Sequence, residues 1–299
     1  MVKYQNIAFI FPSLKPGGGN RAMLQLYEKH IEEGNKAKIF YLKNKGPSLE
    51  LKKNYVYKNF KLKSDKKLHF IIGIILMLIE IKNDNEIKIV FFSDPIISIF
   101  SIILNNKKLI RYVQADDLNL YKEHPKSNFI TYFIYKILIL ISTRYKYDKV
   151  LFNSQYSYDA YNIFIKKLPF YYLPPSLFNA NYRLDKDHFE KVICKKKIIV
   201  GTIARSHKTK GYSDFLWLSE KMKDDRFSFI SISQDNLPKN NFIKNYKPYN
   251  DDEYQEILKK CDIIVNTSYF EGFGLPPLEA MSFGILVIAR ENEGLKQYA

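Results

Sequence analysis

The chain has 299 residues, of which 46% are hydrophobic and 15% aromatic, and its formal net charge is +16. This composition excludes a disordered or collagen-like chain, and the length allows one large domain or two ordinary ones. The only two cysteines, Cys194 and Cys261, lie far apart with no Cys-x-x-Cys spacing. Their positions argue against a disulfide framework or a structural zinc site, and they fit a reducing compartment.

Short apolar runs alternate with helical patterns along the first half of the chain. The run Ile7–Phe11 predicts a strand, and the stripe of Leu24, Tyr27 and Ile31 predicts a helix over Arg21–Glu33, with Gly34 at its end. The further expected strands are Lys38–Leu42, Glu86–Phe92, Leu109–Gln114, Val150–Asn153 and Phe170–Leu173, and the further expected helices are Leu68–Ile81 and Phe129–Ser142.

A second alternating set follows an interruption at Pro174 and Pro175. The polar stretch from Ser176 to Lys197 is interpreted as an interdomain connection. Beyond it, the expected strands are Ile198–Ile203, Phe227–Ser231, Asp262–Thr267 and Ile285–Ala289, and the expected helices are Asp214–Met222, Asp252–Lys260 and Pro276–Phe283.

Continuous apolar strands separated by helices are typical of a parallel sheet that is covered on both faces. We therefore expect an α/β fold with two Rossmann-like, doubly wound domains, residues 1–178 and 179–299. In such folds ligands bind at the carboxyl ends of the strands, here in a cleft between the domains.

Two apolar runs, Leu68–Ile79 and Phe129–Ser142, fall short of the roughly 20 residues that a spanning helix needs. Both are expected to be buried or interfacial helices. The N-terminal run Ile7–Phe11 is too short for the core of a signal peptide. We therefore expect a cytoplasmic protein, associated at most with the inner face of the cell membrane.

The positive charge is concentrated in the first half. Residues 1–178 hold 28 Lys and Arg against 14 Asp and Glu, whereas residues 179–299 hold 19 against 17. Two interpretations stay open. The abundance of Lys, Asn, Ile, Phe and Tyr fits the coding bias of an AT-rich genome, or a basic first half faces a polyanion such as a membrane, a lipid phosphate or a nucleic acid.

Three glycines, Gly17, Gly18 and Gly19, lie between the first expected strand and the first expected helix. Glycines in this position let backbone amides approach a ligand, and a helix N-terminus favours an anion. The pattern is neither a dinucleotide-binding fingerprint nor a P-loop. A plain tight turn is the alternative to a phosphate site.

Two basic residues, Arg205 and Lys210, follow the expected strand Ile198–Ile203. An arginine can hold phosphate oxygens in a bidentate manner, and a lysine acts as a mobile point charge. These residues therefore predict an anion site at the carboxyl end of that strand. A solvated basic loop is the alternative interpretation.

The stretch from Glu271 to Glu279 carries the strongest chemical signal. Glu271 follows a buried strand, Gly272 and Gly274 free backbone amides at the start of a helix, and Glu279 lies in the early turns of that helix. Each carboxylate can accept two hydroxyl hydrogen bonds, while the amides between them face an anion. The spacing predicts a site for a polyhydroxyl ligand that carries phosphate.

The segment from Cys261 to Ala289 resembles the retaining glycosyltransferases of family 4, which have the GT-B fold. Seven residues separate Glu271 from Glu279, as in the paired-glutamate motif of that family. The weaker matches to the family are Gly201–Gly211 for its phosphate-binding Arg and Lys-Gly, Gly17–Gly19 for its N-terminal glycine turn, and Leu151–Ser154 and Tyr172–Pro175 for late strands of its first domain.

The resemblance implies a role for each matching residue. Arg205 and Lys210 would hold the donor diphosphate, Glu271 would contact the transferred sugar, and Glu279 would bind the ribose hydroxyls. Further donor contacts would come from Gly18, Gly19, the amides of Phe273, Gly274 and Leu275, and the backbone near Lys247 and Pro248, which would lie against the nucleobase.

The chain departs from the family in two places. Many members have a histidine after the strand that corresponds to Leu109–Val113, where this chain has Gln114-Ala115-Asp116-Asp117. A role on the acceptor or sugar side would fall to Gln114 or Asp116, or be absent. Members also continue well beyond the strand matching Ile285–Ala289, whereas this sequence stops at Ala299. We therefore expect an incomplete second domain with one exposed side, weakened stability and little or no transfer.

Together these features predict a glycosyltransferase that moves a sugar, with retention of configuration, from a nucleotide sugar to a hydroxyl of a glycan or lipid-linked acceptor. The resemblance suggests bacterial surface polysaccharide or glycolipid synthesis. The acidic pairs Asp116-Asp117 and Asp251-Asp252 lack the arrangement of a metal–diphosphate site, so neither a metal nor a cofactor is expected. An anionic membrane is a further expected partner, and nucleic acid is not. The alternatives are a relative that binds the donor without turnover, and a basic module that binds membranes or polyanions.

Overall fold

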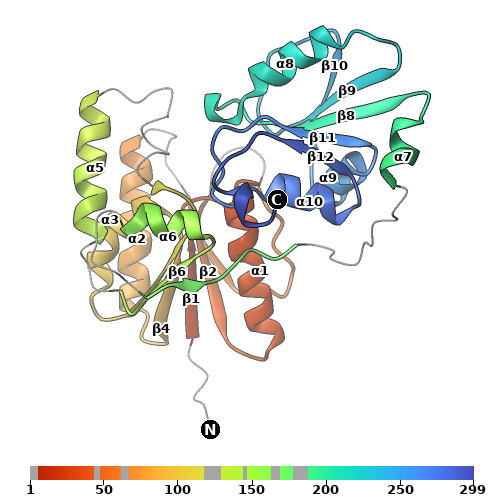
Figure 1. The fold of residues 1–299 in the computed structure, drawn as a ribbon. Helices are drawn as coiled ribbons and strands as arrows, with labels where there is room; N and C mark the ends of the chain where they lie inside the picture. Colours follow the sequence, from red (N-terminus) through yellow and green to blue (C-terminus); the bar gives the residue numbers. More distant parts are fainter. Residues whose placement is uncertain are drawn as a thin grey trace. The chain divides into compact units, whose positions relative to one another are not determined.

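The computed structural model describes residues 6–43, 48–61, 67–117, 129–143, 147–162, 169–177 and 188–299. This part of the chain divides into two compact units, and the division falls between Pro175 and Ser176. We call them the first and the second unit and describe each by itself (Figure 1). The predicted boundary after residue 178 falls in the segment 178–187, outside the described residues.

The first unit is built on a seven-stranded sheet with the order β3-β2-β1-β4-β5-β6-β7. Every neighbouring pair of these strands is parallel. Its strands are β1 (Asn6–Phe11), β2 (Ala37–Lys43), β3 (Tyr57–Lys61), β4 (Ile87–Phe92), β5 (Lys108–Val113), β6 (Lys149–Phe152) and β7 (Tyr171–Tyr172). Its helices are α1 (Gly18–Glu32), α2 (Lys67–Asn83), α3 (Pro95–Phe100), the 3-10 helix η1 (Ser101–Leu104), α5 (Phe129–Thr143) and α6 (Gln155–Asn162).

Strand β1 shows how the first sheet builds a core on both faces. Successive side chains of a strand point to opposite faces. Ile10 packs in a buried cluster with Met77 of α2, while Phe9 packs in a second buried cluster with Tyr27 of α1. The rings of Phe9 and Tyr27 meet edge to face, 5.5 Å between centroids. The continuous apolar run is therefore buried on both sides, as predicted for a parallel sheet.

The second unit holds a five-stranded parallel sheet with the order β10-β9-β8-β11-β12. Its strands are β8 (Ile198–Ile203), β9 (Phe227–Ile232), β10 (Ile243–Tyr246), β11 (Ile263–Asn266) and β12 (Leu286–Ala289). Its helices are α7 (His188–Ile193), α8 (Tyr212–Lys221), α9 (Asp251–Leu258), α10 (Leu275–Ser282) and the 3-10 helices η2 (Lys208–Lys210) and η3 (Leu295–Gln297).

Helices of the second unit cover opposite faces of its sheet. Phe215 of α8 is buried with Val200 and Phe229 on one face, whereas Leu258 of α9 is buried with Ile264 on the other. Because β8, β11 and β12 are parallel neighbours, their carboxyl ends share one edge of the sheet. The loops that follow these three strands therefore meet at that edge.

The two Rossmann-like sheets confirm the predicted fold class, and β8 has the predicted bounds. Several local predictions were wrong. Gly18 and Gly19 form the first turn of α1 and not a loop before it, and α7 lies inside the stretch interpreted as a connection. No helix among the described residues is long and apolar enough to cross a membrane.

Candidate functional site

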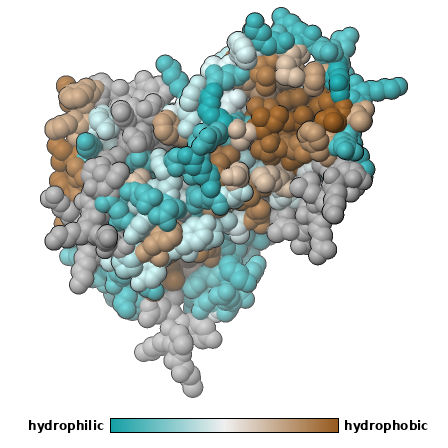
Figure 2. Space-filling view, viewed as in Figure 1, coloured by the Kyte–Doolittle hydropathy of each residue, from teal (hydrophilic) through white to brown (hydrophobic). Residues whose placement is uncertain are grey.

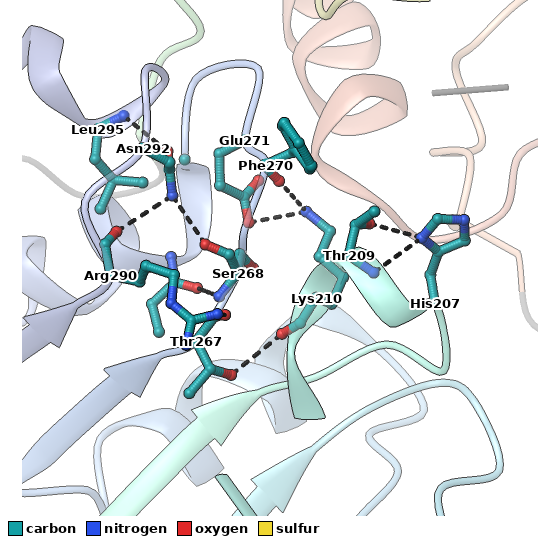
Figure 3. Close-up of polar contacts among 12 residues, drawn as sticks. His207, Thr209, Lys210, Thr267, Ser268, Phe270, Glu271, Arg290, Asn292 and Leu295 are labelled. Carbon is teal, nitrogen blue, oxygen red and sulfur yellow. Dashed lines mark hydrogen bonds and ion pairs between the residues drawn. The ribbon is translucent and has the colours of Figure 1, made fainter. Parts of the chain in front are cut away.

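The loops after β8 and β11 bring Lys210 and Glu271 into contact. Nζ of Lys210 lies 2.8 Å from Oε1 of Glu271 and donates to the carbonyl oxygen of Phe270 at 3.5 Å (Figure 3). The Glu271 side chain is only 9% exposed. A carboxylate so removed from water needs a partner, and the Lys210 ammonium supplies it.

The loop after β8 is held in place by its own side chains and by the loop that follows β11. His207 caps η2, because its Nδ1 accepts a hydrogen bond from the backbone N–H of Thr209. The Thr267 hydroxyl donates to the carbonyl oxygen of Lys210 at 3.2 Å, and the Tyr269 N–H donates to that of Thr209 at 2.7 Å. The backbone of Lys210 is thus fixed to the loop that carries Glu271.

Gly211 allows this close approach of the two loops. Its φ is +63°, a left-handed conformation that glycine adopts without strain. A Cβ atom at this position would lie 2.2 Å from the carbonyl oxygen of Thr267. Both the conformation and the space therefore require glycine next to Lys210.

The segment after β12 braces the same loop from the other side. Nδ2 of Asn292 donates to the carbonyl oxygen of Ser268 at 3.1 Å, while its Oδ1 accepts from the Leu295 N–H at 3.3 Å (Figure 3). Gly294 lies so close that an added Cβ would be 2.4 Å from the carbonyl oxygen of Glu271. The backbone of Glu271 is therefore supported by this segment.

Beside this site an ionic cluster joins α8 to the loops that follow β11 and β12. Arg290 donates from Nη2 to Oδ2 of Asp214 at 2.7 Å, and the Tyr269 hydroxyl donates to the same oxygen at 2.9 Å. The Arg290 guanidinium also lies 3.8 Å from the centroid of the Tyr269 ring. Burial alone would raise the pKa of Asp214, but the hydrogen bonds from Arg290 and Tyr269 outweigh it and lower that pKa.

The glycine-rich loop leads directly into α10. Gly274 is the N-cap of this helix, with a φ of +83°, and its carbonyl oxygen accepts a hydrogen bond from the Tyr298 hydroxyl. Leu275 is the first helical residue, and Phe273 is buried with its ring 5.6 Å from that of Tyr298. The amides at this helix start carry the positive end of the helix dipole.

Glu279 projects from α10 and is buried, with 6% of the residue exposed. The hydroxyl of Tyr254, on α9, donates to its Oε2 at 2.5 Å. The two glutamates of the motif therefore differ in their partners. Glu271 contacts the Lys210 ammonium, and Glu279 accepts a hydrogen bond from the Tyr254 hydroxyl.

The other predicted residues of the second unit have contacts of their own. Nη1 of Arg205 lies 3.6 Å from Oδ1 of Asp235, and the carbonyl oxygen of Pro248 accepts a hydrogen bond from Nε2 of Gln234. Burial would raise the pKa of Asp235, but hydrogen bonds from Ser206 and the Arg205 charge lower it. Arg205 is thus positioned by an acidic partner at the start of the loop that ends with Lys210.

In the first unit the structure brings Gln114 to the glycines at the start of α1. Nε2 of Gln114 donates to the carbonyl oxygen of Gly19 at 3.2 Å, and a Cβ on Gly19 would lie 3.0 Å from Oε1 of Gln114. Nδ2 of Asn153 donates to the carbonyl oxygen of Gln114 at 2.8 Å. Gly18 begins α1, so the predicted glycine and Gln114 sites are neighbours in this unit.

A buried ion pair, Arg111 with Asp117, lies next to Asp116 in the sequence. The adjacent Asp117 accepts from Nη2 of Arg111 at 2.8 Å, and Arg111 is fully buried. Burial raises the pKa of Asp117 to about 6, against the lowering effect of Arg111. The Arg111–Asp117 pair thereby fixes the segment that carries Gln114 and Asp116 to β5. Within the described residues, no three His, Cys, Asp or Glu side chains form a group that could hold a metal ion.

Residues 184–299 match the family model described as "Glycosyl transferases group 1". This segment includes Arg205, Lys210, Glu271 and Glu279. No curated protein matches the chain in sequence.

Solved structures match nearly the whole chain at low sequence identity. Sucrose-phosphate synthase from Thermosynechococcus elongatus is 16% identical, with a TM-score of 0.74 over 98% of this chain and 83% of that one. WaaG, a glycosyltransferase involved in lipopolysaccharide biosynthesis, is 14% identical, with a TM-score of 0.72 over 98% and 83%. HepE from Anabaena, in complex with UDP and glucose, is 16% identical, with a TM-score of 0.64 over 99% and 83%.

The chain has the GT-B fold. In this GT-B chain the group 1 match covers most of the second unit, and it includes the residues of every contact described above around Lys210 and Glu271. The segment that matches the family model therefore contains these loops.

Several residues of this candidate site were missed from the sequence. Asp214, Asp235, Tyr254, Arg290 and Asn292 all contact predicted residues or their loops. The only sequence signal for them is their position just after strands or in the next helix. Their partners lie on other loops or helices, so the contacts depend on the sheet order.

Proposed function

We propose that the chain transfers a sugar from a nucleotide-sugar donor to a hydroxyl acceptor. One observation carries this proposal, namely the 2.8 Å contact between Nζ of Lys210 and Oε1 of Glu271. A cation suited to a leaving phosphate thereby lies beside a carboxylate suited to sugar hydroxyls. The bond between sugar and phosphate would sit where both groups can reach it.

Lys210 and Arg205 would stabilise the negative charge that develops on the diphosphate as it leaves. Preorganised charges act strongly in a site with little water, because they need no reorganisation during the reaction. The Asp214, Tyr269 and Arg290 cluster and the Asn292 brace would hold the loops in that arrangement. We assign this charge stabilisation to side chains and not to a metal, and transfer should therefore persist in the presence of a chelator.

Glu271 would orient the transferred sugar through its hydroxyls, and Glu279, held by Tyr254, would bind the ribose. Gly18, Gly19 and the amides of Phe273, Gly274 and Leu275 would add donor contacts, while Gln114 and Asp116 would serve the acceptor or sugar side. We infer retention of configuration from the resemblance to family 4. The acceptor would be a glycan or a lipid-linked sugar at the inner face of a bacterial membrane.

A thermal-stability screen with nucleotide sugars tests donor binding. A ligand at about 100 times its Kd adds roughly 2.7 kcal/mol to the free energy of unfolding. We expect one nucleotide sugar to raise the Tm of the wild type and to raise that of the Lys210→Ala variant less. Release of nucleoside diphosphate in the presence of acceptor then tests turnover. Binding without release would reduce the function to donor binding, and no stabilisation by any donor would contradict the proposal.

A further inference from the structure

Helix α5 of the first unit carries large apolar side chains on two opposite faces. One face is buried, with Tyr135 and Ile139 packed near Ile99 of α3. The opposite face is exposed, with Phe129 at 80% and Ile130 at 68%. We call this exposed face the α5 stripe; it consists mainly of Phe129, Ile130, Phe133, Ile134, Ile137 and Ile141. Figure 2 shows hydrophobic side chains at the left edge of the view, where Figure 1 places α5.

The spacing of the α5 stripe makes it one continuous surface. Positions three and four apart lie on the same side of a helix, as Ile130, Ile134 and Ile137 do. The exposed side of a surface helix is ordinarily polar, and soluble proteins rarely expose a contiguous apolar patch of this kind without an interaction partner. A helix that is apolar on both faces therefore needs an apolar environment on each.

The charges around α5 identify the chemistry of that environment. Lys136 is the only charged residue of the helix, while residues 122–149 as a whole hold six Lys and Arg against two Asp and Glu. Basic residues thus precede and follow the apolar helix in the sequence. Anionic lipid headgroups complement such flanks, whereas a second copy of this chain would bring like charges together.

The length of α5 fixes how it could meet a bilayer. Its 15 residues span about 22 Å at 1.5 Å per residue, which is less than the roughly 30 Å of a hydrocarbon core. Phe129 and Phe133 stack at the start of the helix, 6.4 Å between ring centroids. A short helix with an apolar face and basic flanks lies in the membrane interface, parallel to its surface.

We propose that the α5 stripe docks the protein on a bilayer that contains anionic lipids. The apolar side chains of the α5 stripe enter the boundary between headgroups and acyl chains, and the net positive charge of residues 122–149 attracts the anionic headgroups. This inference rests on the proposed function, because docking would bring the site to a lipid-linked acceptor at the bilayer surface.

Flotation of the full chain with lipid vesicles tests this docking. We expect the wild type to float with vesicles of phosphatidylcholine and phosphatidylglycerol, and less with phosphatidylcholine alone. The double variant Ile130→Glu, Ile134→Glu should partition at least tenfold more weakly into the mixed vesicles. The control is Trp217→Glu, which places a negative charge at an exposed apolar position of the second unit and should float like the wild type.

A fluorescence experiment keeps the test independent of the folding of the charged variant. Trp217 is the only tryptophan, so Ile137→Trp in a Trp217→Phe background reports on the α5 stripe alone. Docking predicts a blue shift with mixed vesicles and quenching by brominated acyl chains. Unchanged emission would overturn the proposal.

Three further outcomes would also decide the question. Equal flotation of the wild type and the double variant, or no flotation of the wild type, would contradict docking through α5. A wild-type dimer that becomes a monomer in the double variant would identify the α5 stripe as a protein interface instead. Failure of the proposed function would be distinguishable from failure of docking. In that case the wild type would float with the vesicles, but no nucleotide sugar would raise its Tm.

Discussion

Nζ of Lys210 and Oε1 of Glu271 lie 2.8 Å apart on loops that follow two neighbouring parallel strands, β8 and β11. In the proposed site, the anion-binding and the hydroxyl-binding halves would meet at this pair. A donor that entered this site would exchange part of the Lys210–Glu271 contact for contacts with phosphate and sugar. Substitutions on the two sides of the pair should therefore have different kinetic effects.

Replacing Lys210 by alanine should lower transfer by about 100- to 1000-fold, because the charge that stabilises the leaving phosphate is lost. Arg205→Ala should act in the same direction. Lys208→Ala is the control, because this lysine is exposed in the same loop. Initial rates of nucleoside diphosphate release measure all three. A larger loss for Lys208→Ala than for Lys210→Ala would contradict the assignment.

The two glutamates should separate in a binding assay with nucleoside diphosphate alone. Glu279→Gln should weaken that binding about 10- to 100-fold, since hydrogen bonds to a charged group contribute about 1.5–3 kcal/mol. Glu271→Gln should leave binding of the bare nucleotide intact or slightly tighter, because Lys210 loses its competing partner, yet it should impair sugar transfer.

Tyr254→Phe serves as the matched control for Glu279, because it removes only the hydroxyl that holds this carboxylate. Calorimetric titration should show a smaller loss for it, in the same direction as for Glu279→Gln. Equal losses of nucleotide binding for Glu271→Gln and Glu279→Gln would disprove their separate roles.

Gly211→Ala should lower the free energy of unfolding by about 3 kcal/mol or more, through left-handed strain and collision with the Thr267 carbonyl. Gly34→Ala shares a positive φ but has no atom within 4 Å of the added Cβ. It should cost only about 1–2 kcal/mol, the left-handed strain alone. Urea unfolding of both variants gives the comparison, and similar losses would show that space around Gly211 is not limiting.

Arg290→Ala should reveal the pH dependence of Asp214. The folded-state pKa of this carboxyl is lowered, so its contribution to stability is present above its unfolded pKa and is lost as the pH falls. Solvent screening limits the effect at neutral pH to about 1 kcal/mol. The difference between wild type and variant should shrink below about pH 4. A difference that stays constant down to low pH would exclude Asp214 as the titrating partner.

The apolar parallel strands could be predicted from sequence because burial on both faces leaves a continuous hydrophobic run. β8 is such a strand. The missed strands β3 and β10 are the outermost strands on one side of their sheets, and their runs Tyr57–Lys61 and Ile243–Tyr246 alternate with polar residues. A half-exposed edge strand has the same composition as a loop, so its pattern alone does not identify it.

Lys210 and Glu271 could be singled out from the sequence because their residue types and their positions after strands indicate a chemistry, and the structure places the two side chains in contact. Their supporting residues could not be singled out in this way. Asn292 and Arg290 act on loops distant in sequence, and those contacts exist only because β12 lies beside β11. The sequence also did not show which side chains of α5 are exposed. A helix that is apolar on all sides gives no pattern that distinguishes its buried face from its exposed face.

The segment from Arg290 to Tyr298, which supports the loop of Glu271 and Gly274, has a consequence for protein synthesis. A nascent chain that has emerged only as far as β12 lacks Asn292, Gly294 and Tyr298, and with them the backbone contacts of Ser268, Glu271 and Gly274. By contrast, the Tyr112 hydroxyl of the first unit reaches its partner once Leu173 has emerged. Domains fold in order as the ribosome releases them. The first unit can therefore be folded before the loop of Glu271 has formed its contacts with Asn292, Gly294 and Tyr298.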